Sequence, residues 1–355
     1  MEIKVKKREP LQEKPDWNEI GFGKYLTDHM FHMDYDEGIG WHDARIEPTG
    51  PITLPPHAVV LHYGQETFEG LKAYRRPDGH VQLFRPDMNA KRLIQSNIRM
   101  GIPEIPEEMF VEAVTSLVEM ESEWVPPFGD ESSLYIRPFV YATEGMLGLH
   151  RPSQYRFSIL MSPCGPYFGT GLQPVKILVE DEYVRAVRGG TGFTKCGGNY
   201  AGAILATELA EKKGYSQVLW LDGIFRKYVE EAGGMNFMYL MDGEFWTAPL
   251  EGTVLPGVTR DSIIQTLHDW GYTVHEDFVT IDDLMEGVRQ GRVTEAFACG
   301  TAAVIGPIGS LTFRGEEAVI GNFETGKVTK KLYDYLTGIQ WGTVEDPHGW
   351  TLFVC

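Results

Sequence analysis

Apolar residues recur along this chain at two spacings, and each spacing predicts a different element. In residues 87–100, Ala90, Leu93 and Ile94 follow the i, i+3, i+4 pattern of an amphipathic helix. A second apolar stripe begins after Pro106 and consists of Phe110, Ala113, Val114, Leu117 and Val118. We predict that both segments are helices. Arg92 lies on the first, whereas the apolar stripe of the second packs in the core and carries no chemistry.

Short apolar runs bounded by turn residues predict strands. Leu71–Tyr74 and Val81–Phe84 flank the turn residues Pro77, Asp78 and Gly79, which is typical of a β-hairpin. Four prolines in residues 39–62 favour turns there. Further strands are expected at 133–141, 155–161, 175–179, 217–222, 236–241, 244–247 and 295–299, with helices at 199–213, from Pro256-Gly257 to Gly271, and at 327–340.

Both halves of the chain therefore mix strands and helices, so the fold class is α/β or mixed α+β. The segment from Pro163 to Pro174 holds three prolines and three glycines, which is typical of a linker between domains. We expect a smaller N-terminal domain at 1–163, a linker at 164–174 and a larger C-terminal domain at 175–355.

Composition narrows the classes of partner. The chain has 355 residues, 43% of them hydrophobic, and a formal net charge of −18. Such a charge disfavours nucleic acid and anionic membranes, which bind basic patches. The four cysteines form no C-x-x-C pair, the N-terminus lacks the apolar run of a signal peptide, and no apolar stretch is long enough to span a membrane. A cytoplasmic enzyme with reduced thiols is expected.

Residues 188–200 are the most informative stretch for chemistry. They place one lysine, Lys195, among five glycines, with Tyr200 close behind. Glycine allows close approach of the backbone to a ligand, and a lysine amine forms Schiff bases with carbonyls such as that of pyridoxal phosphate (PLP). Taken alone, the stretch fits a solvated glycine loop with a surface lysine equally well.

Three other segments could complete a PLP site. Glu231 precedes two glycines and could pair with a pyridine nitrogen, although a solvated turn glutamate is the simpler interpretation. Pro256-Gly257 opens a predicted helix, whose free amides could bind a phosphate or serve only as a cap. Thr301, after a predicted strand, offers a hydroxyl.

Two other classes of site are disfavoured. His29 with His32, and His57 with His62, are the closest histidine pairs, but no carboxylate or cysteine spacing completes a metal site. No G-x-G-x-x-G follows a strand and opens a helix near the glycine stretch, so a nucleotide-dependent dehydrogenase is a remote alternative.

Together these segments resemble a known family. E-x-G-x-x-N at 231–236, Thr247 and L-P-G-V-T-R at 255–260 are similar to the signature of fold-type IV PLP transaminases. Met238 departs from it, since an aromatic residue is expected there, and should affect packing more than chemistry. The resemblance narrows to branched-chain amino-acid aminotransferases, on the stretches 22–30, 61–74, 83–92, 134–138, 192–200 and 300–302.

The resemblance implies roles for individual residues. It implies a two-domain fold with PLP at the domain interface. Lys195 would form the Schiff base with PLP and would also transfer the proton between Cα and C4′. Glu231, rather than the adjacent Glu230, would pair with the pyridine nitrogen. Tyr200 would donate to the ring oxygen. The phosphate would be held by Arg92, Val258, Thr259 and Thr301.

The substrate pocket implied by the resemblance is apolar and aromatic. Arg137 would meet the side-chain carboxylate of glutamate, and Thr301-Ala302 the α-carboxylate. Arg137 and Tyr135 share one strand face. The remaining pocket residues would be Phe22, Phe68, Tyr135, Tyr167 and Gly234, with Tyr63, Leu147 and Leu149 reaching in from the second subunit of a homodimer.

The implied reaction is ping-pong transfer of the amino group of L-leucine, L-isoleucine or L-valine to 2-oxoglutarate, with metabolite levels setting its direction. D-Amino-acid transaminases and aminodeoxychorismate lyases are usually shorter and lack the 61–74 and 134–138 patterns. The intact Lys195, Glu231 and Arg92 argue against a non-catalytic PLP-binding regulator. Mammalian relatives carry a C-x-x-C redox pair where this chain has Ala303 and Gly306, so we expect no thiol regulation there.

Overall fold

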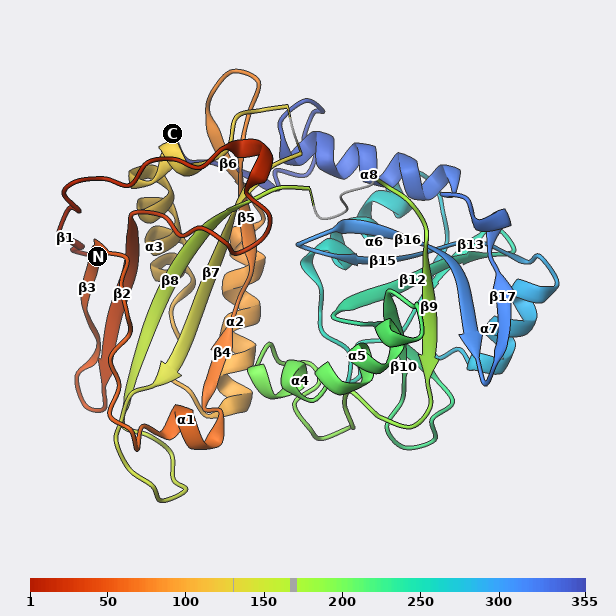
Figure 1. The fold of residues 1–355 in the computed structure, drawn as a ribbon, viewed down its shortest axis with the longest axis horizontal. Helices are drawn as coiled ribbons and strands as arrows, with labels where there is room; N and C mark the ends of the chain where they lie inside the picture. Colours follow the sequence, from red (N-terminus) through yellow and green to blue (C-terminus); the bar gives the residue numbers. More distant parts are fainter. Residues whose placement is uncertain (130, 167–170) are drawn as a thin grey trace. The chain divides into compact units, whose positions relative to one another are not determined.

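The computed structural model describes residues 1–129, 131–166 and 171–355. The chain forms two compact units (Figure 1). Unit 1 consists of Met1–Tyr167, Thr194–Gly197 and Gly338–Cys355, and unit 2 of Phe168–Phe193 and Gly198–Thr337. This division differs from the expected one, because the segment that carries Lys195 and the C-terminal residues both join unit 1.

Unit 1 is built on a nine-stranded sheet in the order β1-β3-β2-β8-β7-β5-β6-β18, with β4 paired to β7. The C-terminal strand β18 pairs antiparallel with β6, which accounts for the inclusion of the C-terminus in this unit. The strands are β1 Lys4–Val5, β2 His29–Asp36, β3 Gly40–Pro48, β4 Glu66–Phe68, β5 Leu71–Arg75, β6 Val81–Phe84, β7 Ser133–Ala142, β8 Gln154–Cys164 and β18 Thr351–Phe353.

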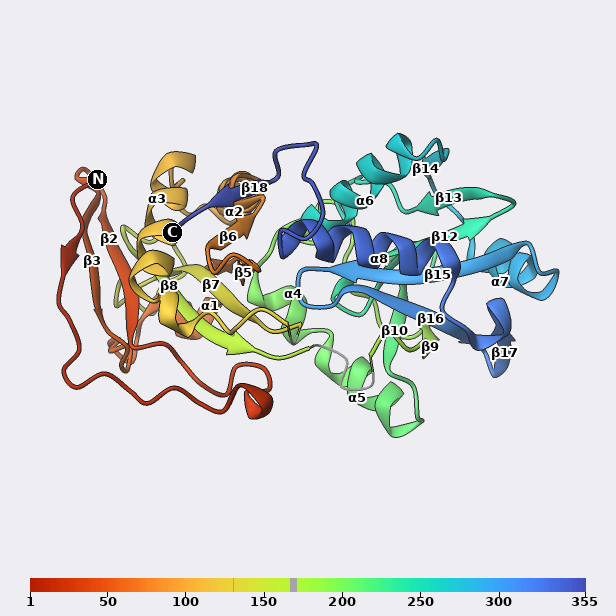
Figure 2. The same cartoon turned by 90° about the horizontal axis from the view of Figure 1, so that it is seen from above.

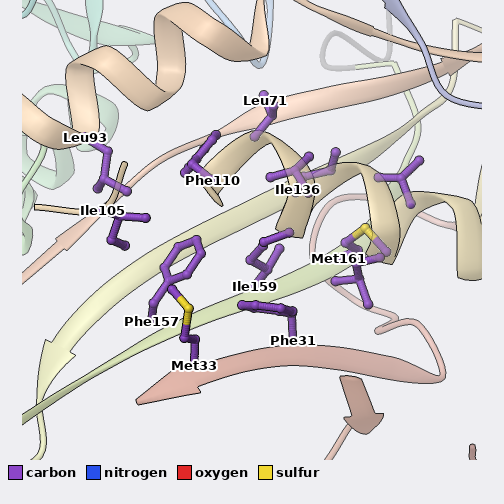
Figure 3. Close-up of a cluster of buried hydrophobic side chains, with 14 of the residues drawn as sticks. Phe31, Met33, Leu71, Leu93, Ile105, Phe110, Ile136, Phe157, Ile159 and Met161 are labelled. Atoms are coloured by element: carbon purple, nitrogen blue, oxygen red, sulfur yellow. The ribbon is translucent and has the colours of Figure 1, made fainter. Parts of the chain in front are cut away.

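Helices α2 (Pro86–Met100) and α3 (Glu107–Met120) pack against each other and against this sheet. Figure 3 shows Leu93 of α2 and Phe110 of α3 directed toward Ile136, Phe157 and Ile159 of the sheet. All five residues of the predicted stripe from Phe110 to Val118 are fully buried, so that prediction is confirmed. The unit also contains α1 Val59–Tyr63 and the 3₁₀ turns Trp17–Glu19 and Ser122–Trp124.

Unit 2 contains a second nine-stranded sheet, in the order β11-β10-β9-β16-β15-β12-β13-β14, with β17 on β16. Strand β11 also pairs with β12, so the strands from β11 to β12 close into a ring. Closure removes the free sheet edges at this point. The strands are β9 Val175–Glu180, β10 Gln217–Leu221, β11 Val229–Ala232, β12 Met235–Met241, β13 Glu244–Thr247, β14 Val274–Glu276, β15 Val293–Gly300, β16 Val304–Phe313 and β17 Glu316–Val319.

The helices of this half of the chain can be followed in Figure 2. They are α4 Gly197–Ala201, α5 Ile204–Lys212, α6 Val258–Asp269, α7 Ile281–Arg289 and α8 Lys327–Gln340, with a 3₁₀ turn at Gly321–Phe323. The apolar residues of α7, among them Leu284 and Met285, pack with those of β9, β10, β12, β15 and β16 in the core of unit 2. No helix in the described ranges is long and apolar enough to cross a membrane.

Some sequence predictions of elements were wrong. The helix expected at 199–213 is split into α4 and α5 around Gly202, where glycine weakens helix propagation. Residues 40–48, expected to form turns, are strand β3. Strand β16 was not predicted, because nearly all of its residues are buried on both faces and it shows no alternation.

Candidate active site

The lysine segment is anchored to unit 1 by three hydrogen bonds. The backbone N–H of Lys195 donates to Ser96 Oγ of α2 at 3.0 Å, and the carbonyl of Lys195 accepts from the N–H of Phe68 at 2.9 Å. The N–H of Gly197 donates to the carboxylate of Glu66. The segment is therefore held to α2 and β4, and the interpretation as a loose glycine loop does not describe it.

The amine of Lys195 lies in a poorly hydrated, cationic setting. Its Nζ is 5.1 Å from the ring centroid of Phe68. Loss of hydration, followed by the positive charge of Arg92, lowers the pKa of Lys195 to about 8, although Glu69 acts in the opposite direction. Near neutral pH a useful fraction of this amine is neutral, which is the form that attacks carbonyls.

Arg92 projects from α2 and is fixed by a buried carboxylate. Its Nε and Nη2 donate to the two oxygens of Glu69 at 2.7 and 2.8 Å, and Asn89 donates to the same carboxylate at 2.7 Å. Burial opposes the charge of Glu69, but Arg92 prevails and holds the pKa of that carboxyl below its usual value. The guanidinium is thus oriented before any ligand arrives.

Aromatic side chains gather around Arg137 in the same unit. The Phe22 and Tyr135 rings meet edge to face at 5.0 Å, and Arg137 Nη2 donates to the Tyr135 hydroxyl at 2.9 Å. The guanidinium carbon of Arg137 lies 4.8 Å from the centroid of Phe68. A side chain at Gly70 would collide with the Tyr135 hydroxyl, so glycine is required at that position.

Three residues expected to serve a second subunit are exposed. Tyr63 is 45%, Leu147 63% and Leu149 80% accessible, and the Tyr63 hydroxyl donates to the carbonyl of Leu147 at 2.6 Å. Tyr167, the remaining aromatic residue predicted for the pocket, lies outside the described residues.

In unit 2, Glu231 is a buried carboxylate held from two sides. Asn236, its partner across the β11–β12 pair, donates to Oε1 at 3.1 Å, and Arg185 lies 2.7 Å from Oε2. The side chain of Arg185 is buried and also donates to the carbonyls of Gly192 and Thr253. These contacts hold the carboxylate of Glu231 in one orientation, and a carboxylate can accept a hydrogen bond from a protonated pyridine nitrogen.

A cavity of about 510 Å³ in unit 2 lies beside the turn that follows Glu231 and joins β11 to β12. It is lined by Arg185, Tyr200, Gly233 and Gly234, among others. Gly233 has φ +58°, a conformation that favours glycine, and a side chain there would also collide with Gln217. Thus the glycines that follow Glu231 keep this space open.

Helix α6 begins beside Asn236. Its N-cap is Gly257, where an added side chain would collide with the amide oxygen of Asn236, and its first residues Val258 and Thr259 are buried. Amides at such a helix start attract a phosphate. Arg260 instead donates to the carbonyl of Ala248 and to Glu276, which assigns it a structural role.

The other expected positions of unit 2 lie at strand ends and in the core. Thr301 and Ala302 directly follow β15 and are partly exposed. Met238, the departure from the family pattern, is fully buried on β12 between Thr247 and Phe297 of the neighbouring strands. Across the described ranges, no group of three or more His, Cys, Asp and Glu side chains is arranged to hold a metal ion.

Comparison with known proteins shows the family of this chain. The family model described as Amino-transferase class IV matches residues 66–311. A "Probable branched-chain-amino-acid aminotransferase" of Staphylococcus aureus (strain MRSA252) is 53% identical over 353 residues, which cover 99% of this chain and 98% of that protein. The chain belongs to the branched-chain-amino-acid aminotransferases. "Branched-chain-amino-acid transaminase 1" of Bacillus subtilis (strain 168) is 52% identical, and the match covers 97% of this aminotransferase and 96% of that protein.

Solved structures give the same fold. The branched-chain amino acid aminotransferase of Escherichia coli superimposes with a TM-score of 0.76 at 25% identity, covering 92% of this aminotransferase and 99% of that chain. The branched-chain aminotransferase of Thermoproteus uzoniensis with norvaline gives a TM-score of 0.75 at 25% identity, with 92% and 100% covered. These comparisons confirm two predictions from the sequence, the mixed α/β fold of fold-type IV and the aminotransferase activity. Class IV aminotransferases depend on PLP.

Sequence reasoning overlooked three residues that hold the expected site residues in place. Glu69 and Arg185 hold Arg92 and Glu231 respectively, and Glu66 holds the backbone at Gly197. Glu66 and Glu69 lie inside the 61–74 stretch that carried the resemblance, so a search for ionic partners there could have found them. Arg185 gives no such signal, because nothing near it in sequence marks its contact with β11.

Proposed function

We propose that this aminotransferase binds PLP covalently through Lys195 and transfers the amino group of L-leucine, L-isoleucine or L-valine to 2-oxoglutarate in two half-reactions. The observation that carries the proposal is the Lys195 amine itself, with its pKa lowered to about 8 on an anchored segment. We further propose that it acts as a cytoplasmic homodimer, in line with the resemblance.

The residues present fit the cofactor. A charged Glu231 suits a protonated pyridine nitrogen, the start of α6 offers the amides of Val258 and Thr259, and Arg92 offers a preoriented cation. Tyr200 would donate to the ring oxygen and Thr301 to the phosphate. When bound, PLP supplies the electron sink that stabilises negative charge at the substrate Cα.

The chain's own residues then hold and move protons. Lys195, neutral in part near pH 8, would take the proton from the substrate Cα and later release it, because an amine near its pKa both accepts and donates a proton. Glu231, whose carboxylate Arg185 and Asn236 hold in place, would pair with the ring nitrogen of bound PLP and favour its protonated form. Glu69 keeps Arg92 in one orientation through the cycle.

The aromatic group around Arg137 supports the choice of substrates. Phe22, Phe68 and Tyr135 give an apolar surface for a branched side chain. Among the described residues, the buried Nε of Arg137 has no hydrogen-bond partner, so it can also bind the side-chain carboxylate of glutamate. The proposed pocket is completed by Gly234, Thr301-Ala302, Tyr167 and, from a second subunit, by Tyr63, Leu147 and Leu149.

The test combines a spectrum with a substrate panel. The purified protein should show a visible absorption band that borohydride abolishes, and Lys195→Ala should lack both the band and transamination. A panel of amino donors with 2-oxoglutarate should give activity with the three branched-chain amino acids and little with D-alanine. Full activity of Lys195→Ala would exclude the mechanism, and a preference for D-amino acids would exclude the substrate assignment.

A further inference from the structure

Unit 2 has a second cavity that the proposed function does not use. Its volume is about 200 Å³. None of its lining residues belongs to the proposed cofactor or substrate set. They are Arg188, Asp222, Gly223, Ile224, Phe225, Tyr228, Glu230, Thr253 and Phe278.

Glu230 is the unusual member of this lining. It precedes Glu231 on β11, and because successive strand residues point to opposite faces, the two carboxylates are directed to opposite sides of the strand. Glu230 is only 6% accessible. Its Oε1 accepts from the Thr253 hydroxyl at 2.6 Å, whereas its buried Oε2 has no hydrogen-bond partner within the described part of the chain.

A buried carboxylate oxygen without a partner is costly and calls for an explanation. Burial is also the main reason that the pKa of Glu230 is raised, against the effects of Thr253 and Arg185. The other acid of the lining, Asp222, has no such deficit, because its two oxygens accept from the backbone N–H groups of residues 224, 225, 227 and 228. Asp222 shapes the loop, whereas Glu230, which lines the cavity, keeps one buried acceptor unused.

The walls of the cavity are aromatic, and its rim is cationic. Tyr228 contacts Phe225 and Phe278 with centroid distances of 6.2 and 5.4 Å. Phe225 and the adjacent Ile224 are 71% and 61% accessible, so the apolar wall of the cavity reaches the surface. The guanidinium carbon of Arg188 lies 5.5 Å from the Phe278 centroid, and Arg188 is half exposed and paired with Glu251.

We propose that this cavity is a second ligand site, for an apolar α-amino acid whose ammonium group binds Glu230 and whose side chain packs against Phe225, Tyr228 and Phe278. An ammonium group donates the hydrogen bond that Oε2 lacks. The carboxylate of the amino acid then lies toward Arg188, which distinguishes an amino acid from a simple amine. At about 30 Å³ per water, the cavity has room for about seven waters, which suits a ligand with about that number of non-hydrogen atoms.

Calorimetry on the full-length protein tests the proposal. The protein is first treated with borohydride, which reduces any Schiff base at Lys195. An added amine then cannot displace the lysine, whether or not a cofactor was bound there. L-Leucine and 3-methylbutylamine, which lacks the carboxylate, are then titrated separately. We expect L-leucine to bind more tightly than the amine, and Arg188→Gln to weaken only the amino acid.

Three variants separate this site from any other. Glu230→Gln should weaken L-leucine binding at least about tenfold, since an amide loses the charge that pairs with the ammonium. Phe225→Ala, at an exposed position, should weaken binding while the fold is retained. Glu316→Gln, at an exposed carboxylate elsewhere in unit 2, is the matched control and should change nothing.

Two results would overturn the proposal. L-Leucine binding that is absent, or that is unchanged in both Glu230→Gln and Phe225→Ala, would show that the cavity is not a ligand site. Equal or tighter binding of 3-methylbutylamine would show that the carboxylate is not recognised. Neither result depends on transamination, so this experiment and the test of the proposed function are independent of each other.

Discussion

Arg185→Met is the most informative perturbation of the site in unit 2. The wild-type guanidinium lies 2.7 Å from Glu231 Oε2, and both side chains are almost fully buried, at 5% and 2% exposure. Methionine keeps the apolar stem but removes the charge and the donors. In the variant, Glu231 therefore keeps the neutral donor Asn236 but loses the buried cation that balances its charge.

The magnitude follows from the cost of an uncompensated buried charge. Breaking a buried ion pair from one side costs about 3–5 kcal/mol of unfolding free energy. Arg185 also donates to the carbonyls of Thr253 and Gly192, worth about 1 kcal/mol each. Together these terms predict that Arg185→Met loses about 5–7 kcal/mol of unfolding free energy, and that Arg185→Lys, which keeps the charge, loses about half of that.

A double-mutant cycle isolates the ion pair from the other contacts. Arg185→Met, Glu231→Gln and the combined variant are compared by urea unfolding of cofactor-free protein. The combined variant should lose at least about 1.5 kcal/mol less unfolding free energy than the two single variants lose together. Cofactor affinity should fall in Arg185→Met and recover in part in Arg185→Lys. Additive losses, or a loss below about 1 kcal/mol for Arg185→Met, would refute the reasoning.

Three further predictions concern other buried groups. The pKa of Lys195 is about 8 in the folded protein and 10.5 ordinarily, so the unfolded chain binds more protons between these values and wild-type stability rises with pH there. The unfolding free energy of cofactor-free Lys195→Met should thus exceed that of wild type by about 3 kcal/mol at pH 7 and lose this advantage toward pH 10.5, as urea titrations at several pH values would show; an advantage independent of pH would contradict this. Glu121→Ala leaves the His29 ring N–H and a buried backbone amide without their acceptor and should cost about 3 kcal/mol in urea unfolding, with faster proteolysis of residues 6–14; a loss under about 1 kcal/mol would be contrary evidence. Iodoacetamide should label Cys355 and not the buried Cys299, whose pKa burial raises to about 12, and mild oxidation should leave activity intact; mass spectrometry and the transamination assay check both, and labelling of Cys299 in folded protein would be the opposing result.

The local elements could be predicted wherever one face of a segment is buried and the other is not. Helix α3 was predicted because its apolar residues repeat at the helical period, and the β5–β6 hairpin because turn residues separate two apolar runs. Strands β11 and β16 were missed, because strands buried on both sides show no alternation. The break at Gly202, where the chain passes from α4 to α5, was overlooked although glycine is a poor helix former.

The sequence by itself determined the family and predicted which residues carry the chemistry, since Lys195, Arg92 and Glu231 stand in motifs whose order and spacing are specific to one family. Only the tertiary structure decided what each of these groups is paired with. The anchoring of Lys195 to Ser96, the clamp of Glu69 on Arg92 and the contact of Arg185 with Glu231 join residues distant in sequence. A charge acts through space, so the lowered pKa of Lys195 and the fixed carboxylate of Glu231 depend on which side chains the fold brings within a few ångströms, and no local pattern encodes that.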